Sequence, residues 1–155
     1  MTATEPAPST GATAAPGIDP RGPRFAAGIT TVVLAVAVLT GSVWVLAAQV
    51  AVFATGSLGG VARSPYAWLY RRLVRPRLGP PAELEDPAPP RFAQTVGLTV
   101  TGIALALALL GVGLAVEIGA GLAFVAAFLN ASIDFCLGCR LYLLLARVRH
   151  RTGPR

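Results

Sequence analysis

Long runs of apolar residues dominate the chain. The first stretch without a charged residue extends from position 25 to position 62, about twice the roughly 20 residues that one helix needs to cross a bilayer. Such a stretch must fold back on itself, and Thr40-Gly41-Ser42 supplies small and polar residues near its centre. The pattern therefore predicts two helices, at about 25–40 and about 43–61.

The second half of the chain repeats this pattern. Charge-free runs cover 92–116 and 118–133, and Glu117 lies between them in a glycine-containing turn. These runs predict helices at about 92–112 and about 114–135, with the last helix extended to 146. We therefore expect an all-α integral membrane protein with four transmembrane helices in two hairpins, a disordered N-terminal tail and a cytoplasmic interfacial loop.

The composition agrees with a membrane protein. Of the 155 residues, 54% are hydrophobic and 13% are charged, whereas an ordinary soluble domain carries about 25% charged residues. The mean hydropathy is +0.65. The 17 glycines and 13 prolines lie in tails and loops or inside apolar runs, which argues against a collagen-like or fully disordered chain.

The arginines indicate the orientation in the membrane. The chain has 13 basic residues, all arginine, and 7 acidic residues, for a net charge of +6. Twelve of the 13 precede the first apolar run, fill the central connection or follow the fourth run, and the two opposite turns contain none. Cytoplasmic flanks collect positive charge. We therefore expect a multi-pass protein of the cell membrane with the N-terminus, the central loop and the C-terminus in the cytoplasm.

The remaining segments predict a single membrane domain between two tails. Residues 1–24 are rich in Ala, Thr, Pro and Gly and cannot bury enough surface to order themselves, so we expect a disordered tail rather than a cleaved signal peptide. The membrane domain covers 25–146 and contains a loop at 62–91. A basic tail covers 147–155.

The central loop has two halves of different character. Tyr66, Trp68 and Tyr70 stand just before Arg71 and Arg72, which predicts a short helix along the cytoplasmic interface with its aromatic rings at the headgroup level. Prolines then recur as far as position 90 and predict an extended, solvated strap. The strap either docks a partner or only connects the two hairpins.

Few polar side chains interrupt the apolar runs. The exceptions are Gln49, Gln94, Asn130 and Asp134. Asn130 and Asp134 are four residues apart on one predicted helix face, so we expect them to form an interhelical hydrogen-bond pair. Intramembrane carboxylates and histidines, which mark ion and proton pathways, are nearly absent, and this argues against a transporter.

Cys136 and Cys139 are the only two cysteines and form the one motif that carries chemistry. A CxxC pair supports thiol/disulfide exchange, in which one sulfur attacks and the other resolves the mixed disulfide. The pair could also supply half of a zinc site, with His150 as a further ligand, or pack as two small buried side chains. Haem attachment is disfavoured because Arg140 stands where that motif needs histidine. We favour the redox interpretation.

The surroundings of the motif favour a reactive thiol. On a continuous helix Ser132, Cys136, Cys139 and Arg140 share one face, and a guanidinium near Cys136 favours the thiolate. A helix that continues to 146 is longer than the roughly 30 Å hydrocarbon core, so both sulfurs are expected at the cytoplasmic boundary. Cytoplasmic thiols are kept reduced, which favours a transient catalytic disulfide over a structural one.

Three segments, 17–28, 63–94 and 126–145, resemble a family of small actinobacterial membrane proteins catalogued as domain of unknown function 4395. The resemblance covers about residues 17–146, and its most specific pieces are 75–81 and 130–139. It implies a four-helix integral membrane protein that is often encoded beside, or fused to, a thioredoxin-like protein and a rhodanese-like sulfurtransferase. Cys136 and Cys139 are the positions it marks as functional.

These observations predict a cytoplasm-facing dithiol that relays electrons or sulfur, with Cys136 attacking, Cys139 resolving and Arg140 tuning the first thiol. Enzymatic activity, if present, would be that of a thiol-disulfide oxidoreductase component. The partners that fit are the lipid bilayer, a thioredoxin-like protein or rhodanese-like sulfurtransferase, and a second copy of the chain; nucleic acid is excluded. No cofactor or metal is identified. The alternatives are a non-catalytic scaffold for soluble sulfur-handling proteins and a small transporter.

Overall fold

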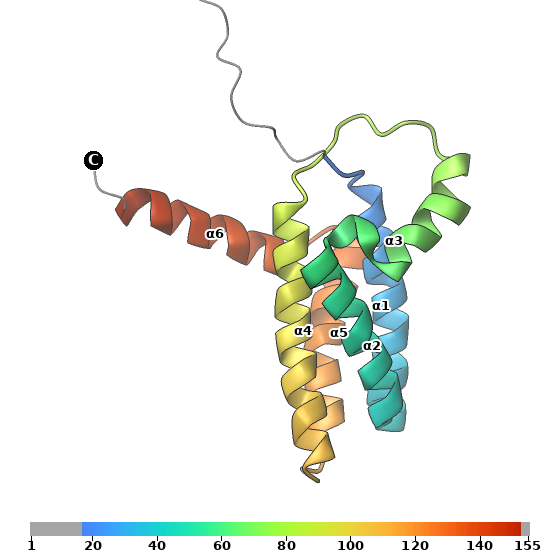
Figure 1. Cartoon of the computed structure of the whole chain (residues 1–155), viewed down its shortest axis with the longest axis vertical. Helices are drawn as coiled ribbons and strands as arrows, with labels where there is room; N and C mark the ends of the chain where they lie inside the picture. The colour runs from blue at the N-terminus through green and yellow to red at the C-terminus, as the bar shows by residue number, and fades with distance from the viewer. Residues whose placement is uncertain (1–16, 153–155) are drawn as a thin grey trace, which may run out of the picture.

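A computed structural model describes residues 17–152 of the chain (Figure 1). Its regular elements are helical, which confirms the all-α class, and the only β pairing in this range is an isolated bridge between Ile18 and Glu85. The elements are α1 (Arg21–Thr40), α2 (Val43–Gly59), η1 (Val61–Arg63), α3 (Pro65–Leu69), η2 (Tyr70–Val74), η3 (Arg75–Arg77), α4 (Ala88–Leu109), α5 (Ala115–Ile133) and α6 (Leu137–Thr152). Residues 1–16 of the predicted tail and the last residues, 153–155, lie outside the described range. The prediction of disorder is wrong for residues 17–24, because Ile18 pairs with Glu85 and α1 already begins at Arg21.

Three of the described helices, α1, α4 and α5, are long and apolar enough to cross a membrane. The fourth helix of the bundle, α2, is apolar but has only 17 residues. Large apolar side chains such as Val32, Ile103 and Val125 are more than half exposed on the outside of the bundle. These features are compatible with a multi-pass membrane protein, whose exterior faces lipid rather than water.

The four long helices run side by side, and their packing differs from two separate hairpins (Figure 1). The most extensive helix pairs are α1 with α5 and α2 with α4, while α1 and α2, which are consecutive in sequence, touch over a smaller area. Leu34, Leu46, Phe53, Ala104 and Ala120 form the centre of the core. Each half of the chain therefore depends on the other half for its packing.

Small residues allow this close packing. A Cβ atom at Gly119 of α5 would clash with the Cβ of Ala104 on α4, and one at Gly97 of α4 would lie 2.9 Å from the ring of Phe53 on α2. In a bilayer, helix association depends on such close contacts because burying apolar surface gives no net gain there.

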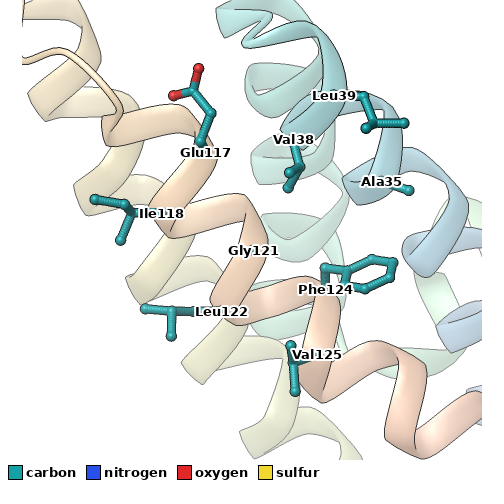
Figure 2. A pocket seen from close by; sticks show the side chains of 9 residues that line it. All are labelled: Ala35, Val38, Leu39, Glu117, Ile118, Gly121, Leu122, Phe124 and Val125. Atoms are coloured by element: carbon teal, nitrogen blue, oxygen red, sulfur yellow. The ribbon is translucent and has the colours of Figure 1, made fainter.

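The turn predicted at Gly41 is confirmed. α1 ends at Thr40, Gly41 takes the left-handed conformation (φ 60°), and the Ser42 hydroxyl accepts the Val45 N–H at the start of α2. A Cβ on Gly41 would lie 2.8 Å from Oε1 of Glu117, so the single acidic residue of this end packs against the turn. Glu117 also borders an open apolar groove between α1 and α5 (Figure 2).

The chain breaks where the sequence predicted a continuous helix. α5 ends at Ile133, Asp134 adopts a left-handed conformation (φ 57°), and α6 starts at Leu137 and projects sideways from the bundle (Figure 1). The predicted extension of the last membrane helix to 146 is therefore wrong. The predicted basic tail is helical as far as Thr152.

The central loop confirms the predicted short helix but not the placement of its rings. Residues 65–77 form α3, η2 and η3 in succession. The Tyr66 hydroxyl donates to Gln49 Oε1 (2.9 Å), and the buried Tyr70 donates to Asp19 (2.8 Å), so both point into the protein, while Trp68 is exposed. Two phenol groups therefore anchor the helix to the bundle because their hydroxyls find polar partners there.

The proline-rich strap is shorter than predicted and is hydrogen-bonded to the segment around the start of α1. α4 already begins at Ala88, with prolines in its first turn, where a missing N–H costs nothing. Ile18 and Glu85 exchange two backbone hydrogen bonds of 2.9 Å, and the Arg21 guanidinium donates to the Gly79 carbonyl at 3.2 Å. The strap therefore packs along the segment that precedes α1.

We expect Gly119→Ala to destabilise the bundle by about 1–3 kcal/mol, because the added methyl group overpacks the α4–α5 contact. Gly121→Ala is the matched control, since a Cβ there meets nothing within 4 Å. Thermal unfolding in detergent micelles measures both. Equal unfolding temperatures for the two variants would contradict the packing described here.

Candidate dithiol site

Cys136 caps the N-terminus of α6. Its carbonyl accepts the first hydrogen bond of the helix, from the Arg140 N–H (3.0 Å), and its Sγ accepts the Cys139 N–H at 3.3 Å. This is the geometry of a side-chain N-cap, with sulfur in the place that serine or aspartate oxygen usually takes. Both cysteines are free thiols and partly exposed. The second cysteine of the motif thus holds the sulfur of the first through its backbone N–H.

The break before Cys136 is stabilised from two sides. The Asp134 and Phe135 N–H groups both donate to the Leu129 carbonyl and so close the end of α5. The Arg24 guanidinium of α1 donates to the carbonyls of Ala131 (3.2 Å) and Ser132 (3.4 Å). The last carbonyls of a helix need external partners. Arg24 therefore acts as a cap for α5, a role that no local sequence pattern indicates.

The pKa values of the two thiols are shifted in opposite directions. A hydrogen bond from the Cys139 side chain, joined by the backbone N–H groups of Cys139 and Gly138, lowers the pKa of Cys136 to about 7, although burial and the Asp134 carboxylate oppose the shift. The same hydrogen bond raises the pKa of Cys139, and burial and the Glu85 carboxylate raise it further. Cys136 is therefore the more acidic thiol of the pair, as its predicted role as attacking thiol requires.

The start of α6 is docked against α4. A Cβ on Gly138 would lie 2.6 Å from both Cα and Cβ of Ala93, so only glycine allows this approach. The rings of Phe92 and Tyr142 pack at 5.7 Å between centroids. Gly138 thus sets the position of the motif rather than the flexibility of its backbone.

The predicted common face of Ser132, Cys136, Cys139 and Arg140 does not exist, because the helix on which it depended is interrupted at Asp134. The Arg140 guanidinium lies over the Phe135 ring, 5.5 Å from its centroid. Its effect on the Cys136 thiol stays a prediction. The groups that lower the pKa of Cys136 belong to Cys139 and Gly138.

Both cysteines line a cavity of about 520 Å³ at this end of the bundle. Its walls come from α1, α2, α4, α5 and the start of α6. Asn130 lines it, but the predicted hydrogen bond between Asn130 and Asp134 is not formed, because Asp134 lies beyond the end of α5. Glu85, from the strap, also lines it. The sequence singled out Gln94 and Asn130 as unusual polar residues but could not bring them together with the cysteines.

No group of three or more His, Cys, Asp or Glu side chains suited to a metal ion occurs among the residues that the structure describes.

We expect the rate at which iodoacetamide alkylates Cys136 to have its pH midpoint near 7. A thiol with a lowered pKa forms the reactive thiolate at a lower pH. An ordinary cysteine has its midpoint at about 8.5. Cys139 should stay unreactive over the same range. Cys139→Ala removes the thiol donor and keeps the backbone N–H, so the midpoint for Cys136 should rise. Mass spectrometry of peptides quenched at each pH measures all three. A midpoint of about 8.5 in the folded wild-type protein would refute the capping geometry as a source of reactivity.

The chain matches the family model described as Domain of unknown function (DUF4395) over residues 18–147. This range includes the four bundle helices, the strap, both cysteines and most of α6. No curated protein and no solved structure matches the chain. The protein is thus a member of the DUF4395 family of domains of unknown function.

Proposed function

We propose that this protein is an integral membrane protein of the cell membrane whose cytoplasm-facing dithiol exchanges electrons with a thioredoxin-like partner. The observation that carries the proposal is the pairing of a Cys136 thiol of lowered pKa with Cys139, which donates to its sulfur. A nucleophilic thiol with a resolving thiol beside it is the minimum that disulfide exchange requires.

Four membrane crossings, by α1, α2, α4 and α5, fit the proposal best. The 17 residues of α2 extend about 26 Å at about 1.5 Å per residue, close to the roughly 30 Å of the hydrocarbon core. Four crossings return the chain to its starting side, and the start of α1 and the end of α5 lie at the same end of the bundle (Figure 1). The arginine distribution supports assigning that end to the cytoplasm.

The crosswise direction of α6 supports an interfacial position for the motif. α6 leaves the bundle sideways (Figure 1), and Leu141, Leu143, Leu144 and Leu145 are exposed along it ahead of Arg147. A helix with exposed apolar side chains and basic residues suits the boundary between acyl chains and headgroups. The cysteines at its start would then lie at that boundary, within reach of a soluble protein.

The exchange proceeds in two steps. The Cys136 thiolate attacks a disulfide of the partner and forms a mixed disulfide, which releases one partner thiolate. Cys139 then gives up its proton and attacks Cys136 Sγ, so that the Cys136–Cys139 disulfide forms and the second partner thiolate leaves. Two electrons pass to the partner, and the same steps run in reverse when the partner is the reductant.

Electron exchange is favoured over sulfur transfer because of where Cys139 lies. A sulfur carrier needs one cysteine that holds a persulfide, and a neighbouring thiol would discharge it. Here the Cys139 N–H contacts Cys136 Sγ directly, so a sulfur atom loaded onto Cys136 would have the resolving thiol beside it. This arrangement suits a couple that closes a disulfide rather than a cysteine that stores sulfur.

We expect Cys139→Ser to trap a mixed disulfide between Cys136 and a thioredoxin variant whose resolving cysteine is serine and whose other cysteine carries a thionitrobenzoate leaving group, because neither protein then has a second thiol that can resolve it. Cys136→Ser is the matched control and should trap none. Non-reducing electrophoresis of full-length protein in native membranes measures the complex. A thioredoxin-like partner that binds the double Cys→Ser variant as well as the wild type, with no trapped complex in Cys139→Ser, would refute the exchange and favour the scaffold.

A further inference from the structure

The cavity behind the dithiol extends deep into the apolar part of the bundle. It begins at Cys136 and Cys139 and reaches Leu122 of α5, eleven residues before the end of that helix at Ile133, a distance of about 16 Å at about 1.5 Å per residue. Its volume of about 520 Å³ falls within the range of about 300–1,000 Å³ that is typical of small-molecule sites. Charged side chains line it only from the segments at the cysteine end.

Three polar side chains from three different helices line this cavity without a hydrogen-bond partner in the described part of the chain. They are Thr30 of α1, Gln94 of α4 and Asn130 of α5. Thr30 is only 5% exposed, although the other threonines of α1 and α4, among them Thr31 and Thr99, donate back to the carbonyl four residues earlier. Polar groups in an apolar interior cost free energy unless something bonds to them. The Gln94 amide oxygen packs against Gly56 of α2, whereas Thr30 and Asn130 line the cavity without such a contact and indicate a ligand.

The residues that line the cavity indicate what kind of ligand fits it. Apolar walls from Phe53, Val100, Leu122 and Ala126 require a largely apolar molecule, and the amide of Asn130 with the hydroxyl of Thr30 requires uncharged oxygen atoms on it. The deep part of the cavity offers no cation for a phosphate, because the arginines that line it, Arg24 and Arg140, belong to the cysteine end. The absence of carboxylates in the described deep part of the cavity disfavours an ion.

We propose that this cavity binds a lipid-soluble quinone and that the Cys136–Cys139 dithiol reduces it. This inference rests on the proposed exchange with a thioredoxin-like protein and adds the acceptor on the membrane side. The bilayer supplies such molecules from within the acyl region, and the two ring carbonyls can accept hydrogen bonds from Thr30 and Asn130, which line the cavity.

The electron balance is complete. The Cys136 thiolate adds to a ring carbon of the quinone, a carbon–sulfur bond forms, and one carbonyl oxygen takes the electron pair and a proton. Cys139 loses its proton and attacks Cys136 Sγ; the sulfur–sulfur bond forms, the carbon–sulfur bond breaks, and its electron pair stays on the ring. A second proton completes the hydroquinone. The dithiol loses two electrons and two protons, the quinone gains both, and a dithiol partner then reduces the disulfide again.

Full-length protein in lipid nanodiscs, reduced and freed of excess reductant, is mixed with decyl-ubiquinone, and loss of the quinone absorbance and disulfide formation are followed together. We expect one quinone to be reduced per dithiol. In Thr30→Val and in Asn130→Leu, the quinone concentration that gives half the maximal rate should rise about fivefold, since each substitution removes one hydrogen bond. Thr99→Val is the matched control and should behave as the wild type, because Thr99 is exposed and donates to the Thr95 carbonyl.

Exchange with thioredoxin, measured on the same preparations, separates the two proposals. If exchange proceeds but quinone is not reduced, or if Thr30→Val and Asn130→Leu need no more quinone than the wild type, the quinone site is wrong and the exchange function stands. The quinone site is equally wrong if a phospholipid copurifies in the cavity and quinone does not displace it. If quinone is reduced but thioredoxin does not react, the quinone site is supported and the thioredoxin-like partner is wrong.

Discussion

The interruption between α5 and α6 determines where both sulfur atoms lie. A continuous helix would carry Cys136 and Cys139 out along the axis of α5, with their N–H groups used inside the helix. Because Asp134 turns the chain and Arg24 binds the last carbonyls of α5, the helix can restart with Cys136 as its cap. The same break directs α6 sideways away from the bundle and leaves both cysteines partly exposed and in the lining of the cavity. The lowered pKa of Cys136, the partial exposure of both cysteines and their position at the end of the bundle all follow from this one turn of the chain.

Much of the fold could be predicted from the sequence, because a bilayer imposes a strong length and hydropathy constraint on each helix. The turn at Gly41 follows from small and polar residues at the centre of an apolar run that is too long for one crossing, and a helix also forms at the start of the central loop, as predicted. The break at Asp134 was missed because no glycine or proline marks it; aspartate tolerates the left-handed conformation, but it does so rarely. Tyr66 and Tyr70 were placed in the headgroups because nothing local shows that Gln49 and Asp19 lie across from them.

Only the cysteine motif of the site could be predicted from the sequence, and not the contacts around it. The CxxC spacing identifies Cys136 and Cys139 and says which chemistry they can support, yet the source of the lowered pKa of Cys136 depends on whether the helix begins at or before this residue. The partners that matter most are distant in sequence: Arg24 lies 107 residues from the carbonyl of Ala131 that it caps, and Thr30, Gln94 and Asn130 come from three helices. Contacts of this kind arise from tertiary packing, which cannot be predicted from a local sequence pattern.

The most direct test of the proposed dithiol exchange is to label the cysteines with a membrane-impermeant maleimide in inside-out and right-side-out vesicles, before and after reduced thioredoxin is added, and to count modified thiols by mass. We expect labelling only in inside-out vesicles, its loss when the protein is oxidised, and its return with thioredoxin. If neither cysteine labels from either side until detergent is added, both are packing residues in the membrane interior and the dithiol exchange is wrong.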